Sequence, residues 1–114
     1  SLGDAQASEA EVAFREAVQL AEGSSLASKP STLYGTLADF CHFLSTQARY
    51  SEARQHCRRS LELSRSAADP DGTCAAQEYL GIMHHMRGDV GRAERAFQRA
   101  IVAAEQGTKP QRLC

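Results

Sequence analysis

The sequence contains little of what β-sheets and membrane-spanning helices require. Among its 114 residues it has three prolines, no tryptophan and only 6% aromatic residues. β-Branched residues, which favour strands, are few, whereas alanine, leucine, arginine and glutamate are common and lose little rotamer freedom in a helix. No apolar run reaches the roughly 18 residues that cross a bilayer. We therefore expect an all-α protein with no membrane partner, and the length fits a single domain over residues 1–114.

The cysteines show no spacing typical of a disulfide framework. Cys41, Cys57, Cys74 and Cys114 form no CxxC pair, and three of them fall on or next to expected helices. The N-terminus also lacks a charged start followed by an apolar block, so no secretory signal is expected. This pattern suits free thiols in a reducing compartment better than disulfides. We predict a cytoplasmic location.

Sequence motifs that support catalysis are also missing. The chain has no GxSxG elbow, no phosphate-binding glycine loop, no HExxH and no dinucleotide fingerprint. Catalysis needs a nucleophile or a perturbed acid–base pair held in a pocket. We predict that the protein is not an enzyme and uses no cofactor.

A metal site is the sharpest alternative, because cysteines and histidines occur together at Cys41–His42 and His84–His85. Adjacent residues on a helix point about 100° apart, so neither pair can chelate one ion. Cys41 and Cys57 fall at packing positions, where cysteine behaves as a small hydrophobe. We expect no metal, and a Cys/His metal- or redox-responsive switch is the least favoured of three functional hypotheses.

Helix start and stop signals divide the chain into five segments. Gly88 followed by Asp89 is the usual order of a left-handed terminal glycine and a new N-cap, and Pro70 after Asp69 suits a first helical turn. Ser8 and Glu11 have the spacing of a capping box, with a start of the first helix as early as Asp4 as the alternative. Apolar residues recur at helical spacing within each segment and are expected to face the core. In the second segment this stripe is Leu33, Leu37, Phe40, Cys41 and Leu44, and in the fifth it is Val90, Ala93, Phe97, Ala100 and Ile101. The expected helices cover about 5–22, 31–46, 50–66, 72–87 and 90–106.

An internal repeat indicates how these helices pack. A pattern of alanine, an aromatic residue or cysteine, a small residue and an aliphatic residue begins at Ala10, Ala53 and Ala93, which are 43 and 40 residues apart. Short connections between the helices make neighbours antiparallel. Small residues recur where two backbones must approach closely, and large ones where the space between helices must be filled.

One copy of this repeat resembles the tetratricopeptide repeat family. The resemblance rests on Tyr79, Leu80, Gly81, His84, Gly88, Asp89, Val90, Ala93, Phe97, Ala100 and Ile101. It implies an α-solenoid of antiparallel helix pairs, similar to the longer-helix variety in kinesin light chains. The second helix of a partial repeat would cover 5–22, full repeats 31–66 and 72–106, and a tail 107–114. Cys41 and Cys57 stand where the family usually has a small and an aromatic residue.

The resemblance implies that the first helix of each pair lines a concave face. Matching positions place both apolar and polar side chains outside the core stripe there, which is typical of a peptide-binding groove. The predicted groove residues are Ala38, His42, Ser45, Glu78, Ile82, His85 and Met86. An ordinary mixed surface is the alternative interpretation.

Some members of the family clamp a C-terminal carboxylate with cationic residues in this groove. Here the corresponding places hold Ala38, Asp39, His42, Ala75 and Tyr79. Without cationic donors, the groove should prefer a neutral or basic protein segment. We predict a scaffold or adaptor module that grips a peptide or helix. The alternative is self-association, as a homodimer or within a longer repeat array, because the array ends have no evident polar cap.

Two arginine stripes invite a nucleic-acid interpretation. Residues 1–48 hold six acids and two bases, net −4, whereas residues 49–114 hold eight acids and eleven bases, net +3. The stripes comprise Arg54, Arg58 and Arg65, and Arg92, Arg95 and Arg99. Glutamates are interleaved and stacking aromatics are missing from the stripes. We therefore predict a solvated face with local ion pairs and no nucleic-acid partner, with binding to an acidic protein surface as the alternative.

Overall fold

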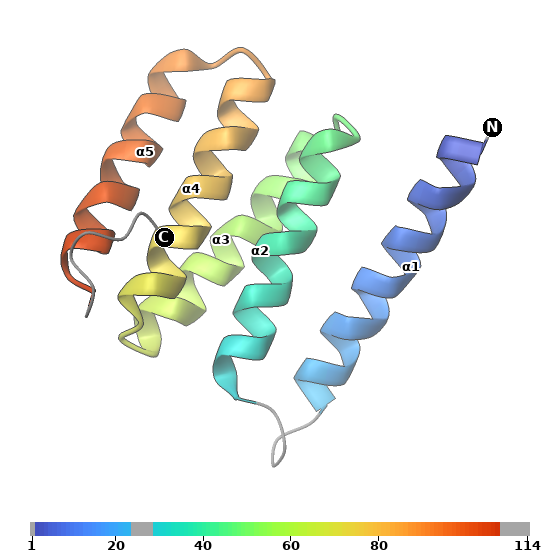
Figure 1. The fold of residues 1–114 in the computed structure, drawn as a ribbon, viewed down its shortest axis with the longest axis horizontal. Helices are drawn as coiled ribbons and strands as arrows, with labels where there is room; N and C mark the ends of the chain where they lie inside the picture. Colours follow the sequence, from blue (N-terminus) through green and yellow to red (C-terminus); the bar gives the residue numbers. More distant parts are fainter. Residues whose placement is uncertain (1, 24–28, 108–114) are drawn as a thin grey trace.

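The computed structural model describes residues 2–23 and 29–107, which form five α-helices without a strand (Figure 1). Successive helices run antiparallel, and α3 lies behind α2 and α4. The helices are α1 (Leu2–Gly23), α2 (Pro30–Thr46), α3 (Tyr50–Ser66), α4 (Pro70–Met86) and α5 (Val90–Glu105). These bounds confirm the predicted all-α solenoid, and most lie within two residues of the predicted ends. Residues 108–114 of the predicted tail lie outside the described part.

The largest difference in the helix bounds is the start of α1. The helix begins at Leu2 and runs through Ser8 without interruption, so Ser8 and Glu11 do not cap it, and the alternative of an earlier start holds. A capping signature predicts a start only where the preceding residues leave the helix. Here the preceding residues, including two alanines, continue it.

The three short turns share one hydrogen-bonded geometry. Ala48, Ala68 and Gly88 each have a positive φ, of 59°, 52° and 83°. In each turn this residue donates to the carbonyl three positions back, and the following residue donates to the carbonyl five positions back. This is the Schellman arrangement, in which a left-handed residue satisfies the last carbonyls of a helix. The predicted left-handed glycine at Gly88 is confirmed, whereas two alanines adopt the same conformation without a signal in the sequence.

Aspartates cap two of the helices that follow these turns. Asp69 accepts a hydrogen bond from the Gly72 amide at 3.1 Å, and Asp89 accepts one from the Arg92 amide at 3.1 Å. Both bonds satisfy amides that lack a partner at a helix start. The predicted cap at Asp89 and the predicted place of Pro70 in a first helical turn are therefore confirmed.

The core follows most of the predicted apolar stripe. Leu37, Phe40 and Leu44 of α2 are fully buried. In α5 the buried positions are instead alanines, whereas Val90 and Ile101, which were predicted to face the core, are exposed. A narrow seam of alanines lets α5 approach α4 closely, and this leaves no room there for branched side chains.

Two helices approach closely at Gly81 of α4 and Phe97 of α5. A Cβ atom added at Gly81 would lie 2.7 Å from the Phe97 ring, a distance that real contacts do not reach. Glycine is therefore required at this crossing, as the sequence predicted for a close-packing position.

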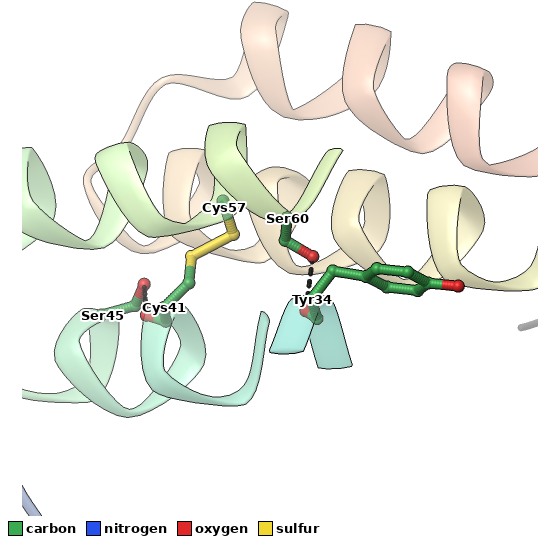
Figure 2. The surroundings of a disulfide bond; sticks show 5 residues. All are labelled: Tyr34, Cys41, Ser45, Cys57 and Ser60. Carbon is green, nitrogen blue, oxygen red and sulfur yellow. Dashed lines mark hydrogen bonds between the residues drawn. A yellow bond between two sulfur atoms is a disulfide. The ribbon is translucent and has the colours of Figure 1, made fainter. Parts of the chain in front are cut away.

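The prediction that Cys41 and Cys57 are free thiols is wrong. They form a disulfide that joins α2 to α3 within one helix pair, with Cα atoms 5.4 Å apart (Figure 2). Both residues are fully buried, as predicted for packing positions. Near the bond, the Ser60 hydroxyl donates to the Tyr34 carbonyl at 2.6 Å, which is a second link between the same two helices. No cysteine in the described ranges is a free thiol.

None of the helices in the described ranges is both long enough and apolar enough to cross a membrane.

Removing the disulfide should destabilise the protein. The bond closes a loop with a sequence separation of 16, and chain-entropy arguments assign about 3 kcal/mol to a loop of that size. We expect the double variant C41A/C57A to lose about this amount in urea denaturation. Peptide mapping of the alkylated native protein provides the control, and recovery of Cys41 and Cys57 as separate alkylated thiols would contradict the disulfide.

Replacing Ala68 with glycine should stabilise the protein by about 0.5–1 kcal/mol. Glycine adopts positive φ without the steric penalty that alanine carries, and the Ala68 side chain is exposed, so little packing is lost. The matched control is Gly88→Ala in the equivalent turn, which should destabilise by a similar amount. Thermal unfolding measures both, and a lower melting temperature for A68G would contradict the assigned turn geometry.

Candidate partner-binding groove

The groove predicted from the repeat lies along α2 and α4. These two helices pack against each other. In the described residues, by contrast, no Cα atom of α3 lies within 8 Å of a Cα atom of α1 or α5, and none of α1 lies that close to α5. When the first helices of successive pairs are in contact and the second helices lie farther apart, the stack curves. The first helices then line its concave side. The first helices, α2 and α4, therefore form the inner layer, and α1, α3 and α5 the outer layer.

Two of the predicted groove residues are not accessible. Ala38 is 3% exposed and Ser45 is 2% exposed. The Ser45 hydroxyl donates to the Cys41 carbonyl at 2.8 Å, one turn earlier in the same helix. These two small residues fill space within the stack, so we withdraw them from the candidate contact surface.

His42 connects the two inner helices. Its ring stacks on Tyr79 of α4, with ring centroids 5.0 Å apart and an angle of 21° between the planes. The Nδ1 atom of His42 is buried and has no hydrogen-bond partner in the described residues. Stacked rings fix the position of both side chains at the floor of the candidate groove.

The accessible part of the predicted set comes mostly from α4. Glu78 and Ile82 are half-buried, and His85 and Met86 are exposed. Together with His42, they place apolar and polar groups side by side on the inner layer. Five of the seven predicted residues are thus at least partly accessible on α2 and α4.

Two acidic side chains act on Tyr79. Burial raises the pKa of the Tyr79 hydroxyl, and the nearby carboxylates of Asp39 and Glu78 raise it further because they disfavour the phenolate. Asp39 and Tyr79 were not among the predicted site residues. They could have been predicted from the sequence, because they stand at positions where some members of the family hold the residues that clamp a carboxylate.

A large cavity lies elsewhere in the stack. It has a volume of about 510 Å³ and is lined by residues of the α3–α4 turn, α4 and α5, including Pro70, Gln77 and Val102. None of the predicted groove residues lines it. The described residues also contain no group of three histidine, cysteine or acidic side chains placed to hold a metal ion.

The arginine stripes form fewer ion pairs than predicted. Arg92 pairs with Asp89 at 3.5 Å, but in the described part of the chain Arg54, Arg58, Arg65, Arg95 and Arg99 form no ion pair. Of the interleaved glutamates, Glu52 pairs instead with arginines outside the two stripes. The predicted local ion pairs are therefore mostly wrong, because only Arg92 among the stripe arginines has an ion-pair partner in the described residues.

Comparison with known proteins supports the repeat architecture. Residues 31–106 match a family model described as tetratricopeptide repeat. Neither the comparison with curated proteins nor that with solved structures returns a significant match. The matched segment covers α2 to α5, which are the two complete helix pairs.

Proposed function

Because the chain belongs to the tetratricopeptide repeat family, whose repeats generally mediate protein–protein interactions, we propose that it is a scaffold or adaptor module. It holds a peptide or helix of a partner protein on the inner layer formed by α2 and α4. The family is typically an interaction module and not an enzyme, which agrees with the missing catalytic motifs.

The observation that carries this proposal is the mixed surface of α4. Ile82 is only half-buried and Met86 is 43% exposed, although both are apolar. They lie beside Glu78 and His85 and outside the core. An apolar surface bordered by polar side chains gains free energy when a partner covers it and its polar groups find hydrogen-bond partners.

Charge defines the class of partner. Asp39 and Glu78 both raise the pKa of the Tyr79 hydroxyl, and no arginine or lysine is among the predicted groove residues. A neutral or basic segment can therefore approach without charge repulsion, whereas an acidic one cannot.

A second candidate function is self-association. Apolar side chains are exposed on the first and the last helix, among them Leu20 of α1, which is 73% exposed, and Val102 of α5, which is 53% exposed. The ends of a solenoid expose such surface until another repeat or subunit covers it. Light scattering separates the hypotheses, because self-association predicts a concentration-dependent dimer and the adaptor function does not require one.

The prediction of a cytoplasmic location stays untested, and its main argument no longer holds. It depended on free thiols, whereas Cys41 and Cys57 are paired. Disulfides are rare in a reducing cytoplasm. An oxidising compartment is compatible with the same interaction module.

Reversing the charge of Glu78 should change peptide preference without unfolding the protein. On an array of neutral, basic and acidic peptides, we expect the native protein to retain neutral and basic sequences. The variant Glu78→Lys should bind the basic peptides about tenfold more weakly. This corresponds to roughly 1.4 kcal/mol, because charge attraction is lost and repulsion is added. The control is Glu94→Lys on the exposed side of α5, which should bind like the native protein. Equal binding by E78K, with an unchanged melting temperature, would place the site elsewhere.

A further inference from the structure

The outer layer contains two equivalent gaps, one between α1 and α3 and one between α3 and α5. In the first gap, opposite charges meet across the helices. Arg49, at the start of α3, pairs with Glu11 of α1, and Arg59 donates to Glu22 at 2.8 Å. Arg15 of α1 in turn contacts Glu52 of α3 at 2.7 Å. The first gap is thus closed by complementary side chains of the chain itself.

The second gap has the arginines of such a network but not the carboxylates. A cavity of about 200 Å³ lies between α3 and α5, with Leu80, His84 and Ala96 among its lining residues. The other lining residues are all arginines, namely Arg54, Arg58, Arg92, Arg95 and Arg99. A neighbouring hollow adds Arg87. No carboxylate lines either hollow.

These arginines form almost no ion pairs, and the nearest carboxylate on α5, that of Glu94, lines an adjoining hollow with Arg95 and Arg99 and not the cavity itself. In the ranges that the structure describes, Arg92 alone among the five has an ion-pair partner, Asp89 at 3.5 Å. Guanidinium groups that surround one hollow repel each other, and the low-dielectric walls of a cleft strengthen the positive potential. An anion that enters the hollow relieves this repulsion. Arginine binds carboxylates in a two-pronged geometry.

His84 supplies an independent observation at the same place. Its side chain is 7% exposed and lines the arginine cavity, and its Nδ1 atom is buried without a hydrogen-bond partner in the described residues. Burial lowers the pKa of His84, and the charges of Arg87, Arg92 and Arg54 lower it further, against the opposing effect of Asp89. A buried polar atom without a partner is costly. A carboxylate bound in the cavity would favour the protonated, positively charged form of the His84 ring.

We propose that this arginine cavity, on the outer layer between α3 and α5, binds an acidic segment of a partner protein. The site is separate from the groove on the inner layer and takes the opposite charge. Side-chain carboxylates at helical spacing are the favoured ligand, because in the first gap the carboxylates of α1 complement arginines of α3. Single-stranded nucleic acid is less suited, because no aromatic ring on which a base could stack lines the cavity.

Fluorescence anisotropy with a labelled glutamate-rich peptide tests this site. The native chain should bind it with an affinity that falls as salt rises, and should bind the matched glutamine-rich peptide at least about tenfold more weakly. The double variant R58Q/R95Q should lose about tenfold in affinity for the acidic peptide, since each exposed charge pair contributes modestly. The control R65Q removes an unpaired arginine of α3 that lies outside the cavity and should leave binding unchanged. Circular dichroism confirms that each variant is folded.

A second readout reports on the cavity directly. Titration of the His84 ring by NMR should show a pKa that rises when the acidic peptide binds, because the added negative charge favours the imidazolium. At the peptide concentration that half-saturates the native chain, the shift of the His84 pKa should be much smaller in R58Q/R95Q. Binding unaffected by R58Q/R95Q, or an unchanged His84 titration, would overturn the proposal. So would displacement of the peptide by equimolar inorganic phosphate, which would indicate a small-anion site, or tighter binding of an oligonucleotide of equal charge.

Discussion

The close contact between Gly81 and the Phe97 ring illustrates the constraint on which this fold depends. Two helix backbones can approach only where one of them carries a small residue, and the partner then fills the space with a ring or a methyl group. Ala53, Ala93 and Ala100 are buried at the corresponding crossings or next to them. Because such residues recur at a fixed interval, the helix pairs stack in phase.

Stacking in phase separates two surfaces with different properties. The inner layer touches through α2 and α4, and the stacked rings of His42 and Tyr79 join these helices. The outer helices are held farther apart, so their side chains must close the gaps. Opposite charges do so between α1 and α3, where Glu11 and Glu22 meet arginines. Between α3 and α5 the same gap keeps its arginines and lacks the acids. The acidic first part of the sequence thus supplies the carboxylates that neutralise the gap between α1 and α3. The basic second part leaves the gap between α3 and α5 with an excess of positive charge.

In the candidate groove, the helical spacing of the residues predicts only part of their accessibility. Spacing placed Glu78, Ile82, His85 and Met86 outside the core stripe, and all four remain at least partly accessible. The same reasoning failed for Ala38 and Ser45, which are buried. Helical spacing gives the direction in which a side chain points, but not how far a neighbouring helix covers it. Short side chains are covered first, because they do not reach past the flanking residues.

By itself the sequence determined the local structure: five helices, their ends, the glycine at the α4–α5 crossing and the repeat that orders them. Capping, left-handed glycine and apolar spacing act over a few residues, so they can be read along the chain. Only the tertiary structure decided the pairing of Cys41 with Cys57, whose Cα atoms lie 5.4 Å apart despite a separation of 16 residues. Only the tertiary structure also decided which arginines form ion pairs with carboxylates. Both outcomes depend on distances between side chains of different helices, and those distances follow from packing.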